Sequence, residues 1–347
     1  MKIFGSLLVS ILSLLVMAGQ SAAAAPGSWE GFKEQFISAE GRVIDFFQQG
    51  ISHSEGQGYA MLLGVGADDQ PTFDRLWQWT RRHLQVRKTD ALHAWSWGRR
   101  INGEQAVVDY NNASDGDICI AWALLLARER WNRGEYGDEA VKIMGSIRRH
   151  LLVEQYGRTF LLPGYYGFGR GEDLVINPSY LVFPALRLFA EHGDRTLWNR
   201  VHDDMLSLLE EKGFGRWQLP ADWLLVQREG VTMFPDKPPI FGYEAIRVLL
   251  WMSWDRSRKP LSGMKLLLDA LAAGAQMPIS IDLAEDQFAE EGASAGFLGV
   301  VANSAARLGR KKQAAELWQK AEQQIVQEEG NYYSQVLYLL ARSRRKQ

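Results

Sequence analysis

Apolar residues recur along most of the chain at the three- and four-residue spacings of amphipathic helices. In one segment the i, i+3, i+4, i+7 pattern runs from Ile118 to Leu125, and in another it runs from Ala314 to Ala321. No stretch shows a convincing series of alternating strands, so we expect an all-α chain. The pattern predicts helices over 29–40, 55–67, 71–86, 116–131, 137–151, 178–192, 195–210, 240–254, 261–274, 293–307, 311–326 and 331–343.

Three connections between these helices are unusually rich in Gly, Pro and aromatic residues, and they lie at 94–112, 163–178 and 217–242. Long loops on a helical scaffold commonly carry binding and chemistry. No Pro/Ser linker or block of charge divides the rest, so we expect 25–347 to form a single domain. Helices in loose pairs fit a closed double ring or an open solenoid equally well.

The first residues have the pattern of a secretory signal peptide. Lys2 supplies a positive start, 3–17 are almost wholly apolar, and 19–25 offer small residues for cleavage. The apolar run is shorter than the roughly 20 residues that a membrane span needs. We therefore expect a signal peptide at 1–24 and a periplasmic or secreted protein, with an uncleaved anchor as the alternative.

Charge and cysteine content exclude several classes of partner and cofactor. The chain carries 39 basic and 41 acidic residues, a net charge of −2, which argues against nucleic acid or another polyanion as a partner. Its single cysteine, Cys119, lies in an apolar helix and is most simply a small core residue. No cluster of His and Cys has metal-ligand spacing, so we expect no metal and no other cofactor.

One acidic run, His-Ser-Glu-Gly-Gln-Gly-Tyr at 53–59, places Glu55 at the start of a predicted helix. With Ser52 three residues earlier, Glu55 could simply complete a capping box. Gly56 and Gly58 favour another interpretation, because each costs roughly 1 kcal/mol relative to Ala in a helix. Close approach of a ligand to the backbone would explain them.

A second run puts Asp115 and Asp117 at the mouth of the next apolar helix. In an ordinary helix start they would be an N-cap and a first-turn acid facing the helix dipole. Acids at helix ends among aromatic residues also suit the breaking of a sugar–sugar bond. That reaction needs one carboxylic acid to protonate the leaving oxygen and a second carboxylate to activate water.

Both runs resemble glycoside hydrolase family 8, the cellulase D family. The segment 113–131 begins Ala-Ser-Asp-Gly-Asp, continues with apolar residues at set spacing and ends in Trp, which fits the family signature at every constrained position. The likeness covers the whole chain and points to the periplasmic endoglucanases encoded with bacterial cellulose synthase. It implies an (α/α)6 barrel of six inner and six outer helices, with a substrate groove across one end.

The resemblance also implies roles for individual residues. Glu55 corresponds to the general acid, and either Asp115 or Asp117 binds the sugar at the cleavage point. Distance to the later motifs favours Asp117, and both are kept as candidates. Tyr180, in the run Asn-Pro-Ser-Tyr at 177–180, corresponds to the residue that helps hold the attacking water, unless this is only a helix start with a core Tyr.

The catalytic base is where the chain departs from the family pattern. The family segment Tyr-Asp-Ala-x-Arg is Tyr-Glu-Ala-Ile-Arg at 243–247, so Glu244 replaces an Asp. It is still a carboxylate, but an offset of about 1 Å can cost roughly 10²-fold in rate. Asp222 and Asp236 are possible substitutes. Arg247 would pair with a carboxylate and keep it ionised, or form an ordinary surface salt bridge.

Aromatic residues in the glycine-rich loops suit a carbohydrate, because flat sugar faces pack on aromatic rings. The chain has 13 Trp. We expect Trp95, Trp97, Tyr166 and also Arg247 to bind substrate, although core packing is the alternative for each ring.

Together these features predict an exported, inverting endo-β-1,4-glucanase that acts on cellulose during bacterial cellulose synthesis or secretion. Its partners would be β-1,4-glucan chains and components of the cellulose synthase or secretion apparatus. One alternative is a glycosidase of the same fold that acts on xylan, chitosan or mixed-linkage glucan. The other is a weakly active glucan-binding assembly factor, which the Glu at position 244 would favour.

Overall fold

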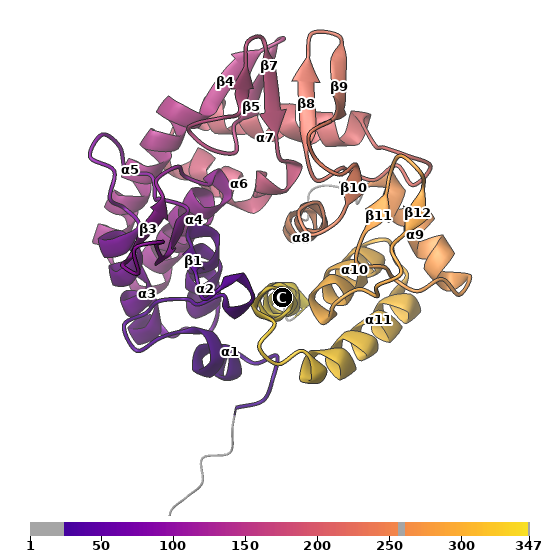
Figure 1. The fold of residues 1–347 in the computed structure, drawn as a ribbon, viewed down its shortest axis with the longest axis horizontal. Helices are drawn as coiled ribbons and strands as arrows, with labels where there is room; N and C mark the ends of the chain where they lie inside the picture. Colours follow the sequence, from indigo (N-terminus) through magenta and orange to yellow (C-terminus); the bar gives the residue numbers. More distant parts are fainter. Residues whose placement is uncertain (1–23, 256–260, 346–347) are drawn as a thin grey trace, which may run out of the picture.

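A computed structural model describes residues 24–255 and 261–345, which form two concentric rings of helices (Figure 1). The inner helices are α2 (Ser54–Gly66), α4 (Ser114–Trp131), α6 (Phe183–His192), α8 (Ile246–Trp254), α10 (Ala295–Arg307) and α12 (Tyr332–Arg345). The outer helices are α1 (Trp29–Phe36), α3 (Gln70–His83), α5 (Gly134–Leu151), α7 (Arg195–Glu211), α9 (Ser262–Ala272) and α11 (Lys311–Gln324). The described part of the chain thus contains every helix that the periodicity predicts, with ends shifted by a few residues.

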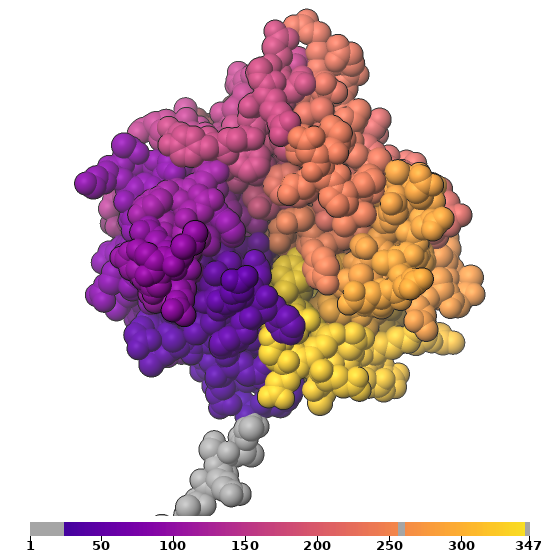
Figure 2. Space-filling view, in the orientation of Figure 1, coloured from indigo at the N-terminus to yellow at the C-terminus, as the bar shows by residue number. Residues whose placement is uncertain are grey.

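The ring is closed, because each inner helix packs against the next and α12 packs against α2. Figure 2 shows the same closure at the surface, where the indigo start of the described chain abuts its yellow end. This contact excludes the open solenoid that helix counting alone allows. The (α/α)6 barrel expected from the family resemblance is therefore confirmed.

Inner and outer helices are buried to different extents. The outer helix α3 buries one stripe at i, i+3, i+4 and i+7, from Phe73 to Thr80, and leaves its other side to solvent. The inner helix α4 is buried on all sides from Ser114 to Leu125, since it has neighbours all round. Cys119 lies inside this buried stretch.

The expectation of no strands is wrong in detail, because small antiparallel sheets lie in the loops. The strands have only two to five residues, too few to show a period of two in the sequence. The first sheet contains β1 (Ser52–His53), β2 (Ser96–Arg99) and β3 (Gln105–Asp109), and the second is a hairpin of β4 (Leu152–Gln155) and β5 (Arg158–Leu161). The third sheet contains β6 (Gly169–Arg170), β7 (Asp173–Ile176), β8 (Leu224–Gln227) and β9 (Gly230–Met233). The fourth contains β10 (Ile240–Phe241), β11 (Ile281–Asp282) and β12 (Gln287–Phe288).

The described residues also contain three short 3₁₀ helices, which are η1 (Phe46–Gln48), η2 (Pro178–Tyr180) and η3 (Ile325–Gln327). The predicted helix 178–192 is split, because η2 covers its start and α6 begins only at Phe183. The predicted signal peptide at 1–24 lies outside the described residues except for its last residue. None of the described helices has the length and apolar character needed to cross a membrane.

The N-terminal ends of the inner helices meet at one end of the ring. Glu55 near the start of α2 and Asp115 near the start of α4 both face Arg247, the second residue of α8. Tyr332, the first residue of α12, has its ring against His53, the residue before α2. Since helix N-termini carry partial positive charge, this end of the ring is suited to carboxylates.

Glycines allow α2 and α4 to approach closely at this end. A Cβ atom at Gly58 would lie 2.8 Å from the Cβ of Cys119, and one at Gly116 would lie 2.8 Å from the backbone nitrogen of Glu55. At Gly56 a Cβ would lie 2.7 Å from the hydroxyl of Tyr332. These glycines therefore serve contact between helices rather than the approach of a ligand to the backbone.

Gly116→Ala should destabilise the protein, because its new methyl group meets backbone atoms of α2 that cannot turn away. We expect a loss of about 1–3 kcal/mol in the free energy of unfolding, measured by urea denaturation. Gly145→Ala is the matched control, since Gly145 is exposed on α5 and a Cβ there meets nothing within 4 Å. That control should be neutral or stabilising by up to about 1 kcal/mol. Equal midpoints for the two variants would contradict the close approach.

Candidate active site

Three carboxylates surround the guanidinium group of Arg247. Its Nη1 lies 3.0 Å from Glu55 Oε2, and its Nη2 lies 3.6 Å from Asp115 Oδ2 and contacts Glu244 Oε2. The Arg247 side chain is only 4% exposed, so this is a buried cluster and not a surface salt bridge. The ring closure brings together residues up to 192 positions apart in sequence.

The charges in this cluster do not balance, because three carboxyl groups face one guanidinium group. Burial raises the pKa of the Asp115 carboxyl well above its usual range, the charge of Glu55 adds to the rise, and Arg247 opposes it. Burial would lower the pKa of Arg247, but the charges of Glu55 and Glu244 outweigh it and raise that pKa well above its usual value. The single cation stays charged, and the Asp115 carboxyl holds its proton more tightly than an exposed acid would.

Glu55 is free to act because it does not take part in a capping box. The start of α2 is capped by His53, whose Nδ1 accepts a hydrogen bond of 2.9 Å from the backbone N–H of Gly56. Ser52 instead accepts a hydrogen bond of 2.7 Å from Arg42. Glu55 Oε1 is buried and has no hydrogen-bond partner among the described residues. The protein therefore does not engage this oxygen of the carboxyl group.

Glu244 is held by the run 177–180. Asn177 Nδ2 donates to Glu244 Oε2 at 2.9 Å, and Ser179 Oγ donates to the same oxygen at 3.3 Å. The backbone carbonyl of Ser179 accepts in turn from Trp251 Nε1 at 3.1 Å. Sequence reasoning considered only the Tyr of this run and missed the roles of its Asn and Ser.

Tyr180 lies beside the same cluster, with its ring centroid 5.7 Å from the guanidinium carbon of Arg247. Burial, followed by the charges of Asp115 and Glu244, raises the pKa of Tyr180 well above its usual value. The hydroxyl therefore stays protonated and can donate a hydrogen bond.

The two substitute bases occupy different surroundings. Asp222 is buried, and its Oδ1 accepts hydrogen bonds from the backbone N–H groups of Gly242 (2.8 Å) and Ala245 (2.9 Å). Burial raises the pKa of Asp222 to about 6. It therefore supports the turn that carries Glu244. Asp236 forms an ion pair of 2.9 Å with Arg170, and its side chain is 58% exposed, well outside the cluster.

The two aspartates of the second run face different surroundings. Asp115 faces Arg247, whereas Asp117 Oδ1 accepts from the backbone N–H of His93 at 2.9 Å and lies 2.8 Å from His93 Nδ1. Asp117 Oδ2 accepts from Asn112 Nδ2 at 2.8 Å, and the side chain is 0% exposed. Asp115 therefore belongs to the carboxylate cluster around Arg247, whereas both oxygens of Asp117 are bound by groups outside it.

Aromatic rings extend from the cluster along the loops. The carbonyl of Trp95 accepts from the backbone N–H of Ser54, the residue before Glu55, at 3.0 Å. Tyr166 is 61% exposed and lies with its ring 4.6 Å from that of Tyr165. Further along, Phe168 stacks on Trp223 at 6.1 Å, and Trp223 lies 6.3 Å from Tyr180. Of these rings, Trp223 and Phe168 are linked to the cluster through Tyr180, and the Tyr165–Tyr166 pair forms a separate group.

The ring of Trp97 does not lie with these aromatic rings. It pairs with Ser52 across β1 and β2, whereas the neighbouring pair joins His53 to Ser96. Successive residues of a strand point to opposite faces, so Trp97 faces away from the side on which His53 contacts Tyr332. Its ring packs against Trp79 at 5.4 Å and Arg42 at 4.5 Å, in a separate pocket of about 420 Å³.

Comparison with known proteins identifies the family. Residues 2–347 match the model of "Glycosyl hydrolases family 8". The chain belongs to this family. It is 35% identical to a probable endoglucanase of Novacetimonas hansenii over 277 residues, which cover 78% of this chain and 80% of that protein. It is 41% identical to an endoglucanase of Cellulomonas uda over 231 residues, 65% of this chain.

The match with the Cellulomonas uda enzyme spans only 63% of that protein's length. A solved relative matches more completely. The endo-β-1,4-glucanase of Acetobacter xylinum aligns with a TM-score of 0.80 and 31% identity, covering 92% of this chain and 96% of that structure. The family 8 fold therefore extends over nearly all of the chain.

In this family 8 chain two glutamates contact the same arginine. Glu55 and Glu244 bind different nitrogens of the same guanidinium group. Hydrogen bonds of ordinary length then place the two carboxylate oxygens at most about 8 Å apart. This limit includes both the separation of about 6.5–9.5 Å in inverting glycosidases, which leaves room for a water, and that of about 5–5.5 Å in retaining ones.

Two further observations on the family 8 chain concern a pocket and possible metal ligands. A pocket of about 1420 Å³ between α9 and α11 is lined mainly by amide, lysine and leucine side chains, away from the carboxylates. Over residues 24–255 and 261–345, no group of three His, Cys, Asp or Glu side chains is arranged to hold a metal ion.

Proposed function

We propose that the chain is an endo-β-1,4-glucanase that hydrolyses cellulose, or a soluble β-1,4-glucan, with inversion at the anomeric carbon. The observation that carries this proposal is the pair Glu55 and Glu244 on the two terminal nitrogens of Arg247. The relatives named endoglucanase support the substrate class. The bordering aromatic rings suit a β-glucan, because its sugar units are flat.

In the proposed reaction, Glu55 donates its proton to the glycosidic oxygen as the bond from that oxygen to the anomeric carbon breaks. The bonding electron pair stays with the leaving oxygen. Glu244 removes a proton from a water that attacks the anomeric carbon from the opposite face, and Tyr180 orients that water. Asp115 contacts the sugar at the cleavage point. Solvent then reprotonates Glu55 and deprotonates Glu244.

The proposed proton donor lies in a crowded cluster. Burial, followed by the charge of Glu55, raises the pKa of the Asp115 carboxyl, and both acids face the same cation. Glu244 accepts hydrogen bonds from two further donors, Asn177 and Ser179, which hold its Oε2 in place.

We further propose that residues 25–347 act as one catalytic domain after removal of a signal peptide at 1–24, in the periplasm or outside the cell. There the enzyme would cut glucan chains made by cellulose synthase. Release of reducing ends from carboxymethylcellulose, together with pull-down on insoluble cellulose, tests the activity. Binding to cellulose without release of reducing ends would instead favour the glucan-binding assembly factor. That alternative is suggested by Glu244, which stands where the family has Asp.

The stereochemistry is a separate expected result. Attack of water on the face opposite the leaving group should give the α-anomer from a β-linked substrate. Proton NMR of product formed within the first minutes, before mutarotation equilibrates the anomers, distinguishes the outcomes. A β-anomer as first product would show a retaining mechanism and contradict the role of Glu244 as a base.

A further inference from the structure

Asp117 has no place in the chemistry proposed above, yet it is fully buried and both of its oxygens are bound. We infer that Asp117 is a positioning residue that acts through Asn112 to hold the Tyr165–Tyr166 segment, and so sets the affinity for a sugar unit stacked on Tyr166. This inference rests on the proposed function, because the ligand is a glucosyl unit of a β-1,4-glucan.

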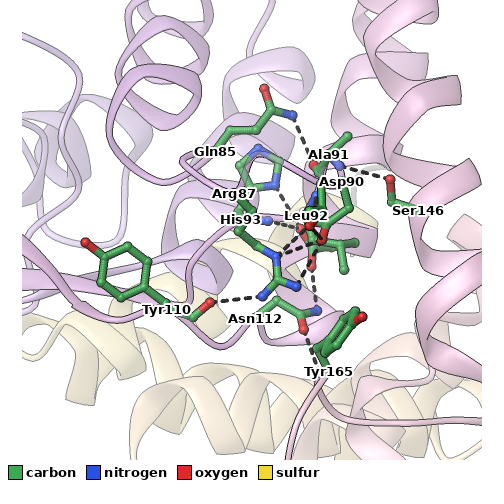
Figure 3. A network of polar contacts seen from close by, with 12 residues as sticks. Gln85, Arg87, Asp90, Ala91, Leu92, His93, Tyr110, Asn112, Ser146 and Tyr165 are labelled. Atoms are coloured by element: carbon green, nitrogen blue, oxygen red, sulfur yellow. Dashed lines mark hydrogen bonds and ion pairs between the residues drawn. The ribbon is translucent and has the colours of Figure 1, made fainter.

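The first step is the orientation of the Asn112 side chain (Figure 3). Its Nδ2 donates to Asp117 at 2.8 Å, and its Oδ1 accepts from the backbone N–H of Tyr165 at 2.7 Å. A carboxylate only accepts hydrogen bonds and a backbone N–H only donates them. Asp117 therefore fixes which end of the Asn112 amide faces Tyr165, and a flipped amide would be unfavourable at both ends.

The second step is the attachment of the neighbouring residue. Asn111 Oδ1 accepts from the backbone N–H of Tyr166 at 3.1 Å, and Asn111 Nδ2 donates to the carbonyl of Tyr166 at 3.0 Å. The carbonyl of Asn111 also accepts from the backbone N–H of Trp95 at 2.8 Å. Two consecutive asparagines thus bind two consecutive tyrosines. Through Asn111 they also connect to Trp95, whose carbonyl accepts from the backbone N–H of Ser54.

The third step is the support behind the rings. The guanidinium carbon of Arg87 lies 4.7 Å from the ring centroid of Tyr165 and 5.9 Å from that of Tyr166. Asp90 holds Arg87 through Nε at 2.8 Å and Nη2 at 3.0 Å, and the carbonyl of Tyr110 accepts from Nη1 at 3.1 Å (Figure 3). The pair of rings is therefore backed on the protein side, while Tyr166 remains 61% exposed to a ligand.

The two carboxylates of the run at 113–131 thus divide their roles. Asp115 faces the bond that breaks, and Asp117 holds the surface that binds a sugar away from that bond. Asp117→Asn is a sharp probe because it changes no heavy-atom count. Its new NH₂ group faces either the backbone N–H of His93 or the NH₂ of Asn112, and relief by a flip of Asn112 would break the bond to Tyr165.

The test is a set of kinetic and binding measurements. Asp117→Asn should raise KM for cellohexaose about tenfold, with kcat within about threefold of the parent, because a stacking contact is weakened and the reacting groups are intact. In an inactive Glu55→Gln background, the same change should weaken cellohexaose binding about tenfold by calorimetry. Tyr166→Ala should have a similar effect, and the Asp117→Asn/Tyr166→Ala double variant should be no worse than either single variant.

Controls separate this role from general stability. Asp255 is also a buried carboxylate on a histidine, 3.2 Å from His202 Nε2, but it lies at the C-terminal end of α8, away from the site. Asp255→Asn should lower the unfolding midpoint and leave KM unchanged. Asn112→Ala breaks the same connection outside the α4 core, and it should raise KM as Asp117→Asn does even if the latter folds poorly.

Three results would overturn the inference: a fall in kcat at unchanged KM, multiplicative effects in the double variant, or an unchanged KM in Asn112→Ala. If the parent chain fails to cleave cellohexaose while its Glu55→Gln variant binds it as tightly as Glu55→Gln/Asp117→Asn, both proposals fail. Cleavage by the parent with no effect of Asp117→Asn removes only this inference.

Discussion

Glu55→Gln should lower kcat on a soluble β-1,4-glucan by at least about 10²-fold, within the usual contribution of general acid catalysis. The amide keeps the shape of the carboxyl group and can still contact Arg247 through its oxygen, but it has no acidic proton for the glycosidic oxygen. KM should change little, since the leaving oxygen gains its proton only as the bond breaks. The measurement is initial-rate kinetics after circular dichroism confirms the fold.

A substrate with a better leaving group makes this test specific. A dinitrophenyl cellooligosaccharide releases a phenolate that needs no proton, so Glu55→Gln should lose far less activity on it than on the glucan. Glu191→Gln on the exposed side of α6 is the matched control and should behave as the parent does. Near-normal turnover of the glucan by Glu55→Gln would remove Glu55 as the proton donor.

The helices were predictable because each outer helix has one buried face. In α3 the buried positions repeat at helical spacing, and this repeat shows directly in the sequence. The closure of the ring was not visible in this way, since the contact between α12 and α2 joins the two ends of the chain. Only the family resemblance supplied it. The short strands were not predicted, because a strand of two to five residues is too short to show an alternating pattern in the sequence.

Within the site, sequence spacing identified the region but not the direction of each side chain. Asp115 and Asp117 stand at i and i+2 of one helix, and such positions point to different sides. The motif therefore pointed to a pair of carboxylates without showing which one joins the cluster around Arg247. For Trp95 and Trp97 the spacing was also uninformative, because Trp95 lies just before β2 and a register shift between Ser96 and Trp97 interrupts the regular alternation of faces.

The glycines were correctly singled out but wrongly interpreted. Two glycines in a first helical turn are unfavourable unless something fills the space of their side chains. The sequence cannot say whether that neighbour is a ligand or another helix. The structure shows α4 beside Gly58 and Tyr332 beside Gly56, so the glycines bring Glu55 close to Asp115.

Glu244→Gln should lower kcat/KM by at least about 10²-fold if Glu244 is the base, because an amide cannot accept the proton of the attacking water. Glu244→Asp should leave kcat/KM unchanged or raise it, since the family carries Asp at this position. The carboxylate is held by Asn177 and Arg247 through one oxygen, Oε2, which leaves Oε1 for the water. The Asp variant keeps this chemistry and removes only the extra methylene.

The rival bases make the opposite prediction. If Asp222 or Asp236 activates the water, both Glu244 variants keep substantial turnover, and Asp222→Asn or Asp236→Asn abolishes it. The geometry favours Glu244, because Asp222 already accepts two backbone hydrogen bonds and Asp236 pairs with Arg170 on the surface. The deciding measurement is kcat/KM for all four substitutions on one soluble β-glucan, at about 1.4 kcal/mol of lost transition-state stabilisation per tenfold. A Glu244→Gln enzyme within about threefold of the parent, less than about 1 kcal/mol on that scale, would exclude Glu244 from the mechanism.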